Sequence, residues 1–200
     1  PWDNLKFSLE GVKEVQRKFF GTLYNTYSFL SLYANIDGFK NEENTILLIE
    51  RNELDRWILS ELNSLIKVVD SCYQDYEPTK AARSISDFVQ EKLSNWYVRL
   101  SRRRFWKGNY EKDKIAAYQT LFECLLETSK LIAPIAPFFG DFLYKNLTEN
   151  TFSEKFESVH LSDFPSAKKE FIDIHLESQI NKARNITSLA LSLRKKEQIK

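Results

Sequence analysis

Residues 78–107 read PTKAARSISDFVQEKLSNWYVRLSRRRFWK, and no glycine interrupts them. Pro78 suits the first turn of a helix, where its missing N–H has no intrahelical partner to lose, and Gly108 suits a helix end. Apolar side chains recur at intervals of three and four residues: Ala82, Ile85, Val89, Leu93, Trp96 and Leu100. At about 100° per residue they form one narrow stripe. The stretch therefore predicts one long helix with a single core-facing side, and Trp96 is expected in the core.

The same periodicity continues on both sides of this stretch. Further helices are predicted over 9–36, from 52 to about 72, over 113–133, from the prolines at 134 and 137 to about 147, and over 173–196. Asn52 and Asp55 form the predicted capping pair of the second helix. Residues 45–49 are a candidate extended piece. The expected fold is all-α, a helical bundle of about five to six helices. Residues 1–147 would form the core bundle, and 148–200 an irregular segment plus a C-terminal helix that packs on it or extends it.

Composition excludes several classes of protein. The chain has 200 residues, 42% of them hydrophobic and 28% charged, which is typical of a globular domain rather than a disordered one. No stretch approaches the roughly 18 apolar residues that a membrane span needs. Two cysteines, Cys72 and Cys124, are too few and too far apart for a disulfide framework. Methionine is absent even from position 1, so we expect the chain to be a piece of a longer polypeptide.

The net charge of +1 hides a local excess of positive charge. Positions 92–110 contain no aspartate or glutamate and six cations: Lys92, Arg99, Arg102, Arg103, Arg104 and Lys107. On the predicted helix, a second stripe beside the apolar one holds Lys92, Asn95, Arg99, Arg102 and Trp106. Guanidinium groups bind phosphates, and indole rings stack on unpaired bases. This stripe, with Lys107, is therefore the predicted RNA-binding surface.

Arg103 and Arg104 fall nearer the apolar stripe. They are secondary RNA-binding candidates, and their alternative is pairing with carboxylates of neighbouring helices. For the whole stripe, the alternatives are a solvated charged face or a surface that meets an acidic protein. The chain has no helix-turn-helix signature and no Cys/His finger, which favours RNA over DNA.

Catalytic and metal signals are weak. Glu157 and His160 match one half of the Glu-x-x-His pairs of di-iron bundles, but Ile172 precedes His175 at the position where the second glutamate would stand. The five glycines are too dispersed for a phosphate-binding loop. We therefore expect no catalytic residue, metal or cofactor in this chain.

Several motifs resemble one family. Residues 17–27 read RKFFGTLYNTY, 53–57 read ELDRW, 95–106 read NWYVRLSRRRFW and 131–138 read LIAPIAPF. In this order they resemble the segment of isoleucyl-tRNA synthetases that follows the catalytic domain, and the resemblance covers essentially the whole chain. The DRW and APF patterns are shared with the valine and leucine enzymes, so the same domain of such a relative is an alternative. The FFGTLYNT and SRRRFW runs resemble the isoleucine branch.

The resemblance implies a helical anticodon-binding domain. Its parent would be a cytoplasmic ligase of protein biosynthesis that activates isoleucine with ATP and transfers it to tRNA. The family's HIGH motif is absent, and KMSKS needs a methionine. ATP, magnesium and any zinc would therefore bind outside these residues, and the chain alone is expected to be non-catalytic. Its expected partners are the tRNA for isoleucine and the catalytic domain of the same polypeptide. We expect no membrane and a monomer.

Overall fold

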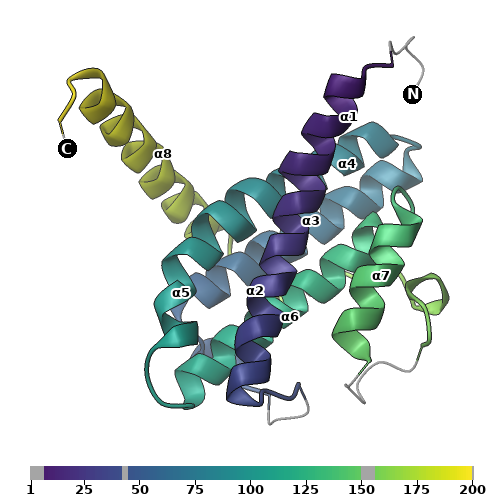
Figure 1. Cartoon of the computed structure of the whole chain (residues 1–200), viewed down its shortest axis with the longest axis horizontal. Coiled ribbons are helices and arrows are strands. Elements are labelled where there is room, and N and C mark those ends of the chain that lie inside the picture. The colour runs from purple at the N-terminus through teal and green to yellow at the C-terminus, as the bar shows by residue number, and fades with distance from the viewer. Residues whose placement is uncertain (1–6, 42–44, 150–155, 200) are drawn as a thin grey trace.

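The computed structural model describes residues 7–41, 45–149 and 156–199. The regular elements are α1 (Leu9–Val15), η1 (Gln16–Phe20), α2 (Gly21–Asp37), η2 (Leu48–Glu50), α3 (Glu53–Gln74), α4 (Pro78–Asp87), η3 (Phe88–Val98), α5 (Arg99–Trp106), α6 (Lys112–Ile132), α7 (Pro137–Thr148), η4 (Val159–Leu161), η5 (Lys169–Phe171) and α8 (Ile174–Lys196). Both α1–η1–α2 and α4–η3–α5 run on without a break, so the described residues form six long helices and no strand (Figure 1). The all-α prediction is confirmed.

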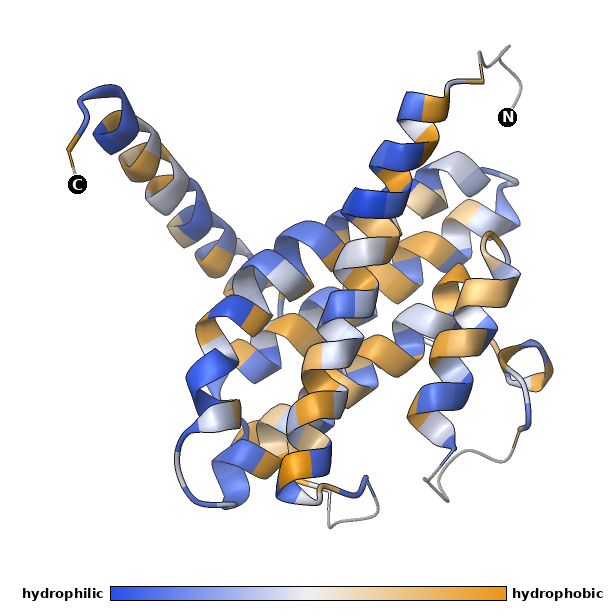
Figure 2. Ribbon diagram, in the orientation of Figure 1, coloured by the Kyte–Doolittle hydropathy of each residue, from blue (hydrophilic) through white to orange (hydrophobic). Residues whose placement is uncertain are grey.

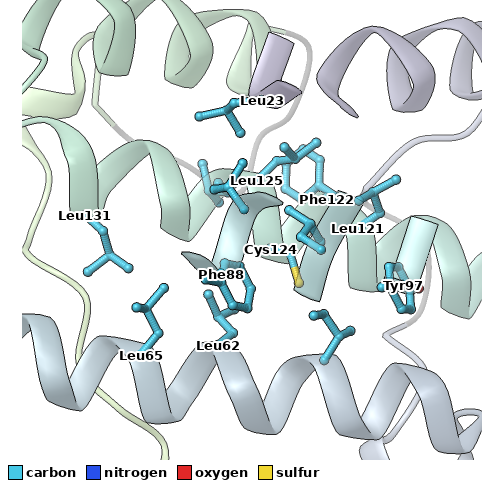
Figure 3. Packing of buried hydrophobic residues seen from close by; sticks show 14 of the residues in the cluster. Leu23, Leu62, Leu65, Phe88, Tyr97, Leu121, Phe122, Cys124, Leu125 and Leu131 are labelled. Atoms are coloured by element: carbon cyan, nitrogen blue, oxygen red, sulfur yellow. The ribbon is translucent and has the colours of Figure 1, made fainter. Parts of the chain in front are cut away.

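Helices α3 and α6 carry much of the core. Apolar residues of α3 and α6 meet Phe88 and Tyr97 of η3 and Leu23 of α2 in one continuous cluster (Figure 3). Trp57, Tyr97 and Tyr118 are among its largest fully buried side chains. Burial of apolar area at about 25 cal/mol per Å² makes this cluster the main stabilising feature of the bundle.

The helix over 78–106 departs from α-helical geometry in its middle. From Phe88 to Val98 it is π-helical, with hydrogen bonds that reach one residue further along the chain than in an α-helix. Each residue then turns the chain by less than 100°, and buried residues recur at intervals of four and five. For that reason the adjacent residues Phe88 and Val89 are both buried, and so are Tyr97 and Val98.

This geometry corrects the predicted core stripe. Ile85, Val89 and Leu93 are buried as expected, but Leu100 is 48% exposed. Ala82 and Trp96 are only half-buried. After the wide turns, Tyr97, Val98, Ser101 and Phe105 take the core-facing positions instead. Trp96 still packs against the edge of the core.

Two local predictions also need correction. Asn52 caps α3 as predicted, because its side-chain oxygen accepts from the N–H of Leu54 at 3.0 Å. Asp55 is not the other half of a capping pair: it is fully buried and binds side chains of the basic helix. Residues 45–49 are extended only in part: Leu47 has extended backbone, but a single 3₁₀ turn begins at Leu48.

The contact between α6 and α7 depends on Gly140. A Cβ atom at this position would lie 3.0 Å from the carbonyl oxygen of Ser129 and 3.1 Å from the Cα of Ala133, both of them backbone atoms. Gly140→Ala is therefore expected to lower the free energy of unfolding by about 1–3 kcal/mol, as overpacking does. Gly11→Ala is the control, since a methyl group there meets only the Ser8 Cβ at 3.8 Å. Equal melting temperatures for the two variants would contradict the expectation.

The C-terminal part leaves the bundle. Asp173 caps α8, accepting from the N–H of Leu176 at 2.9 Å, and Leu176 is buried. Beyond Arg184, every described residue of α8 is exposed, and the helix projects from the bundle (Figure 1). Among the described helices, none is both long enough and apolar enough to span a lipid bilayer.

Candidate RNA-binding surface

The basic helix, residues 88–107, uses two of its six cations inside the protein. Arg104 donates from both terminal nitrogens to the two carboxylate oxygens of Asp55, each at 2.7 Å. It also donates from Nε to Asp113 at 2.8 Å, and the Tyr97 hydroxyl donates to Asp55 at 2.6 Å. Burial opposes the charge on Arg104, but its hydrogen bonds and attraction to Asp55 outweigh burial and raise the pKa of the guanidinium. Arg104, whose side chain is 14% exposed, therefore links α5 to α3 and α6 through the buried Asp55 and through Asp113.

Lys92 is held in a similar way. Its ammonium group lies 2.6 Å from Oε2 of Glu61, a residue only 3% exposed. The indole N–H of Trp57 donates to the other oxygen of Glu61 at 3.2 Å. Lys92 thus balances a buried carboxylate on α3, which leaves its ammonium less free for a phosphate than the sequence indicated.

The remaining cations lie on the surface. Arg99, Arg102, Arg103 and Lys107 are exposed, and no described residue forms an ion pair with them. Asn95 is exposed as well, with a long 3.4 Å hydrogen bond to Glu91. Three guanidinium groups on α5 and the ammonium group of Lys107, which follows its last residue, thus have no ion-pair partner among the described residues and can meet anions. These four cations, together with the neighbouring Asn95, form the cationic face: Asn95, Arg99, Arg102, Arg103 and Lys107.

An aromatic side chain lies at the end of the cationic face. Trp106 is 48% exposed, and its ring lies 6.4 Å from that of Tyr33 on α2. Indole rings with one open side stack on unpaired bases. The surface therefore combines exposed positive charge with one partly exposed indole ring, on a helix that the Arg104–Asp55 pair links to α3.

Pairing with carboxylates, the alternative that the sequence offers for Arg103 and Arg104, is confirmed for Arg104, whereas the partner of Lys92 is not predicted. Asp55 is in phase with Ile58, Leu62 and Leu65, and Glu61 with Trp57. Carboxylates within an apolar stripe need a buried cation or hydrogen-bond donor. That signal indicates that Asp55 and Glu61 need buried partners, but it does not show which cation reaches each of them.

The described residues offer little for catalysis. Burial raises the pKa of the Cys124 thiol well above its usual value, so it is a poor nucleophile. Within residues 7–41, 45–149 and 156–199, no three His, Cys, Asp or Glu side chains are grouped to hold a metal ion. The arrangement is suited to binding a polyanion.

Comparison with known proteins agrees with this geometry. Residues 55–200 match the family model described as "Anticodon-binding domain of tRNA ligase". The chain is 58% identical to an isoleucine–tRNA ligase of Bacteroides thetaiotaomicron, 58% to that of Cytophaga hutchinsonii and 44% to that of Clostridium novyi. Each match covers all of this chain but only 17–19% of the relative. The chain, an all-α bundle with an open cationic face, belongs to the family of tRNA-ligase anticodon-binding domains.

Proposed function

We propose that this chain is the anticodon-binding module of an isoleucine–tRNA ligase. The observation that carries the proposal is the cationic face, where Arg99, Arg102, Arg103 and Lys107 have no ion-pair partner among the described residues. The full-chain identity to isoleucine–tRNA ligases supports the choice of amino acid. The complete enzyme would use ATP and magnesium to attach isoleucine to tRNA in the cytoplasm, with the catalytic domain elsewhere on the polypeptide.

The roles within the surface differ. Arg99, Arg102, Arg103 and Lys107 would bind phosphates of the anticodon stem and position the RNA. Asn95 and Trp106 would contact bases of the loop, by hydrogen bonding and by stacking. Lys92 and Arg104 would hold the basic helix on α3, because their charges are paired with Glu61 and Asp55.

Binding of the 200-residue chain to three ligands at fixed low salt tests the proposal. The ligands are isoleucine tRNA, the same tRNA with a substituted anticodon, and heparin. We expect the first to bind at least about tenfold more tightly than the second, because base contacts cost about 1–3 kcal/mol when mismatched. Equal affinity for both tRNAs would point to a generic RNA-binding module. Equal affinity for heparin would point to a surface that meets acidic partners of any kind.

A further inference from the structure

Helix α8 carries a row of exposed apolar residues that do not pack on the bundle. We call this row, with the lysine at each of its ends, the seam. Its residues, spaced four, three, four and three apart, are Lys182, Ile186, Leu189, Leu193 and Lys196. Ile186, Leu189 and Leu193 are 67%, 66% and 62% exposed. The apolar positions show as orange bands on the projecting helix (Figure 2). Alternating spacings of four and three are those of a coiled-coil seam, which indicates a helix as the occupant.

The seam lies on the side of α8 that faces away from the bundle. The bundle contacts come from Leu176, which is buried, from Glu177, which accepts from Ser64 at 2.8 Å, and from Arg184, which donates to the Glu91 carbonyl at 3.2 Å. At about 100° per residue, these positions lie almost opposite the seam. Packing on the bundle therefore does not explain the apolar residues of the seam.

The positive charge of α8 indicates which kind of partner would pack on the seam. Lys182 and Lys196 stand at the two ends of the seam, and positions 178–196 contain no aspartate or glutamate. An occupant with acidic residues opposite these two lysines would add two ion pairs to the apolar contact. RNA would leave the three aliphatic side chains in water, because the seam has no aromatic ring on which a base can stack.

A second copy of the chain fits poorly. If two α8 helices paired in parallel, Lys182 would meet Lys182 and Lys196 would meet Lys196. If they paired antiparallel, Lys182 of one copy would meet Lys196 of the other. Both orientations place like charges at both ends of the seam. Three apolar side chains also fall well short of the roughly 800 Å² per partner that a stable complex buries.

We infer that the seam of α8 packs against an acidic, amphipathic helix from another part of the same synthetase polypeptide. This inference rests on the proposed function. A tethered partner needs little contact area, because the linkage holds it at an effective concentration in the millimolar range. More than four-fifths of each of the relatives compared above lies outside the matched region, which leaves ample chain to supply such a helix.

Amide hydrogen exchange over residues 186–193 tests the inference, with the 200-residue chain compared against the complete synthetase. In the 200-residue chain these amides should exchange quickly, as in an unsupported helix. In the complete synthetase they should exchange on the order of 100-fold more slowly. Fast exchange in both proteins would overturn the inference. Protection that needs added tRNA would assign the seam to RNA instead, and protection that rises with protein concentration would assign it to a second copy.

Two matched pairs of variants in the complete synthetase identify the contacts. Leu189→Glu should abolish the protection, and Ser188→Glu, one residue away and off the seam, should keep it. Lys196→Glu should reduce the protection by repelling the acidic helix, whereas Lys195→Glu makes the same change of charge off the seam and should not. Equal effects within either pair would contradict the assigned occupant. The anticodon preference of the 200-residue chain does not involve the seam, so failure of the proposed function would be seen separately.

Discussion

Arg104→Ala is expected to lower the free energy of unfolding by about 3–5 kcal/mol, because it leaves the fully buried Asp55 carboxylate without its cation. For a chain of this size the melting temperature should fall by about 10 °C. Asp55→Asn should have a similar effect, since it leaves the guanidinium of Arg104 without its buried counter-charge. Thermal and urea unfolding, followed by circular dichroism, would measure both changes.

The matched control is Arg103→Ala, which removes a neighbouring arginine from the same helix. Arg103 is exposed and has no ion-pair partner among the described residues, so its loss should change stability by no more than about 0.5 kcal/mol. A small effect at Arg104, comparable with that at Arg103, would show that the Asp55 pair does not hold α5 in place.

The triple variant Arg99→Ala, Arg102→Ala and Lys107→Ala should bind isoleucine tRNA on the order of 100-fold more weakly at about 0.1 M salt. Each lost phosphate contact also removes about 0.7–0.9 from the slope of log affinity against log salt, so the slope should fall by about two units. Fluorescence anisotropy titrations at four or five salt concentrations would give both quantities.

The control for this variant removes three exposed cations from other elements: Lys13 on α1, Lys67 on α3 and Lys169 on η5. It makes the same change in net charge, so a general loss of positive potential would affect both variants equally. If the triple variant on the cationic face keeps the salt slope of the unchanged chain, the cationic face is not the RNA-binding surface.

Much of the fold follows from the sequence. Some prolines and glycines mark helix ends: Pro78 begins α4, and Gly38 and Gly108 follow the last residues of their helices with φ values of 69° and 83°. In a long helix with one apolar side, the spacing of the apolar residues shows in the sequence where the helix begins and ends. The all-α fold and the limits of the six helices were therefore predictable to within a few residues.

The rotation of the basic helix was not predictable in the same way. A constant 100° per residue placed Leu100 in the core, but the π-helical turns placed Val98 and Ser101 there. A π-helix differs from an α-helix in hydrogen-bond register rather than in residue preference, so no residue type in the sequence indicates it. The exposed positions Arg99 and Arg102 were nevertheless assigned correctly to the surface.

Pairing between helices was only partly visible. The sequence shows that Asp55 and Glu61 lie among apolar residues of α3, which indicates that both need a partner. It does not show which cation reaches each of them, because that depends on how α3 and the basic helix cross. Lys92, predicted for RNA, is paired with Glu61 in the structure, and Arg104, a secondary RNA candidate, follows its alternative and pairs with Asp55.

The π-helical segment Phe88–Val98 also restricts insertions and deletions in this part of the chain. Loss of one residue from this segment, with its π-helical turns kept, would rotate everything downstream by somewhat less than 100°. Arg104 would swing away from Asp55, and an exposed arginine would turn toward the core. Single substitutions at the surface of this segment are thus far easier to tolerate than a change in its length. The number of residues between Ile85 and Phe105 decides where the arginines of the cationic face point as much as their identities do.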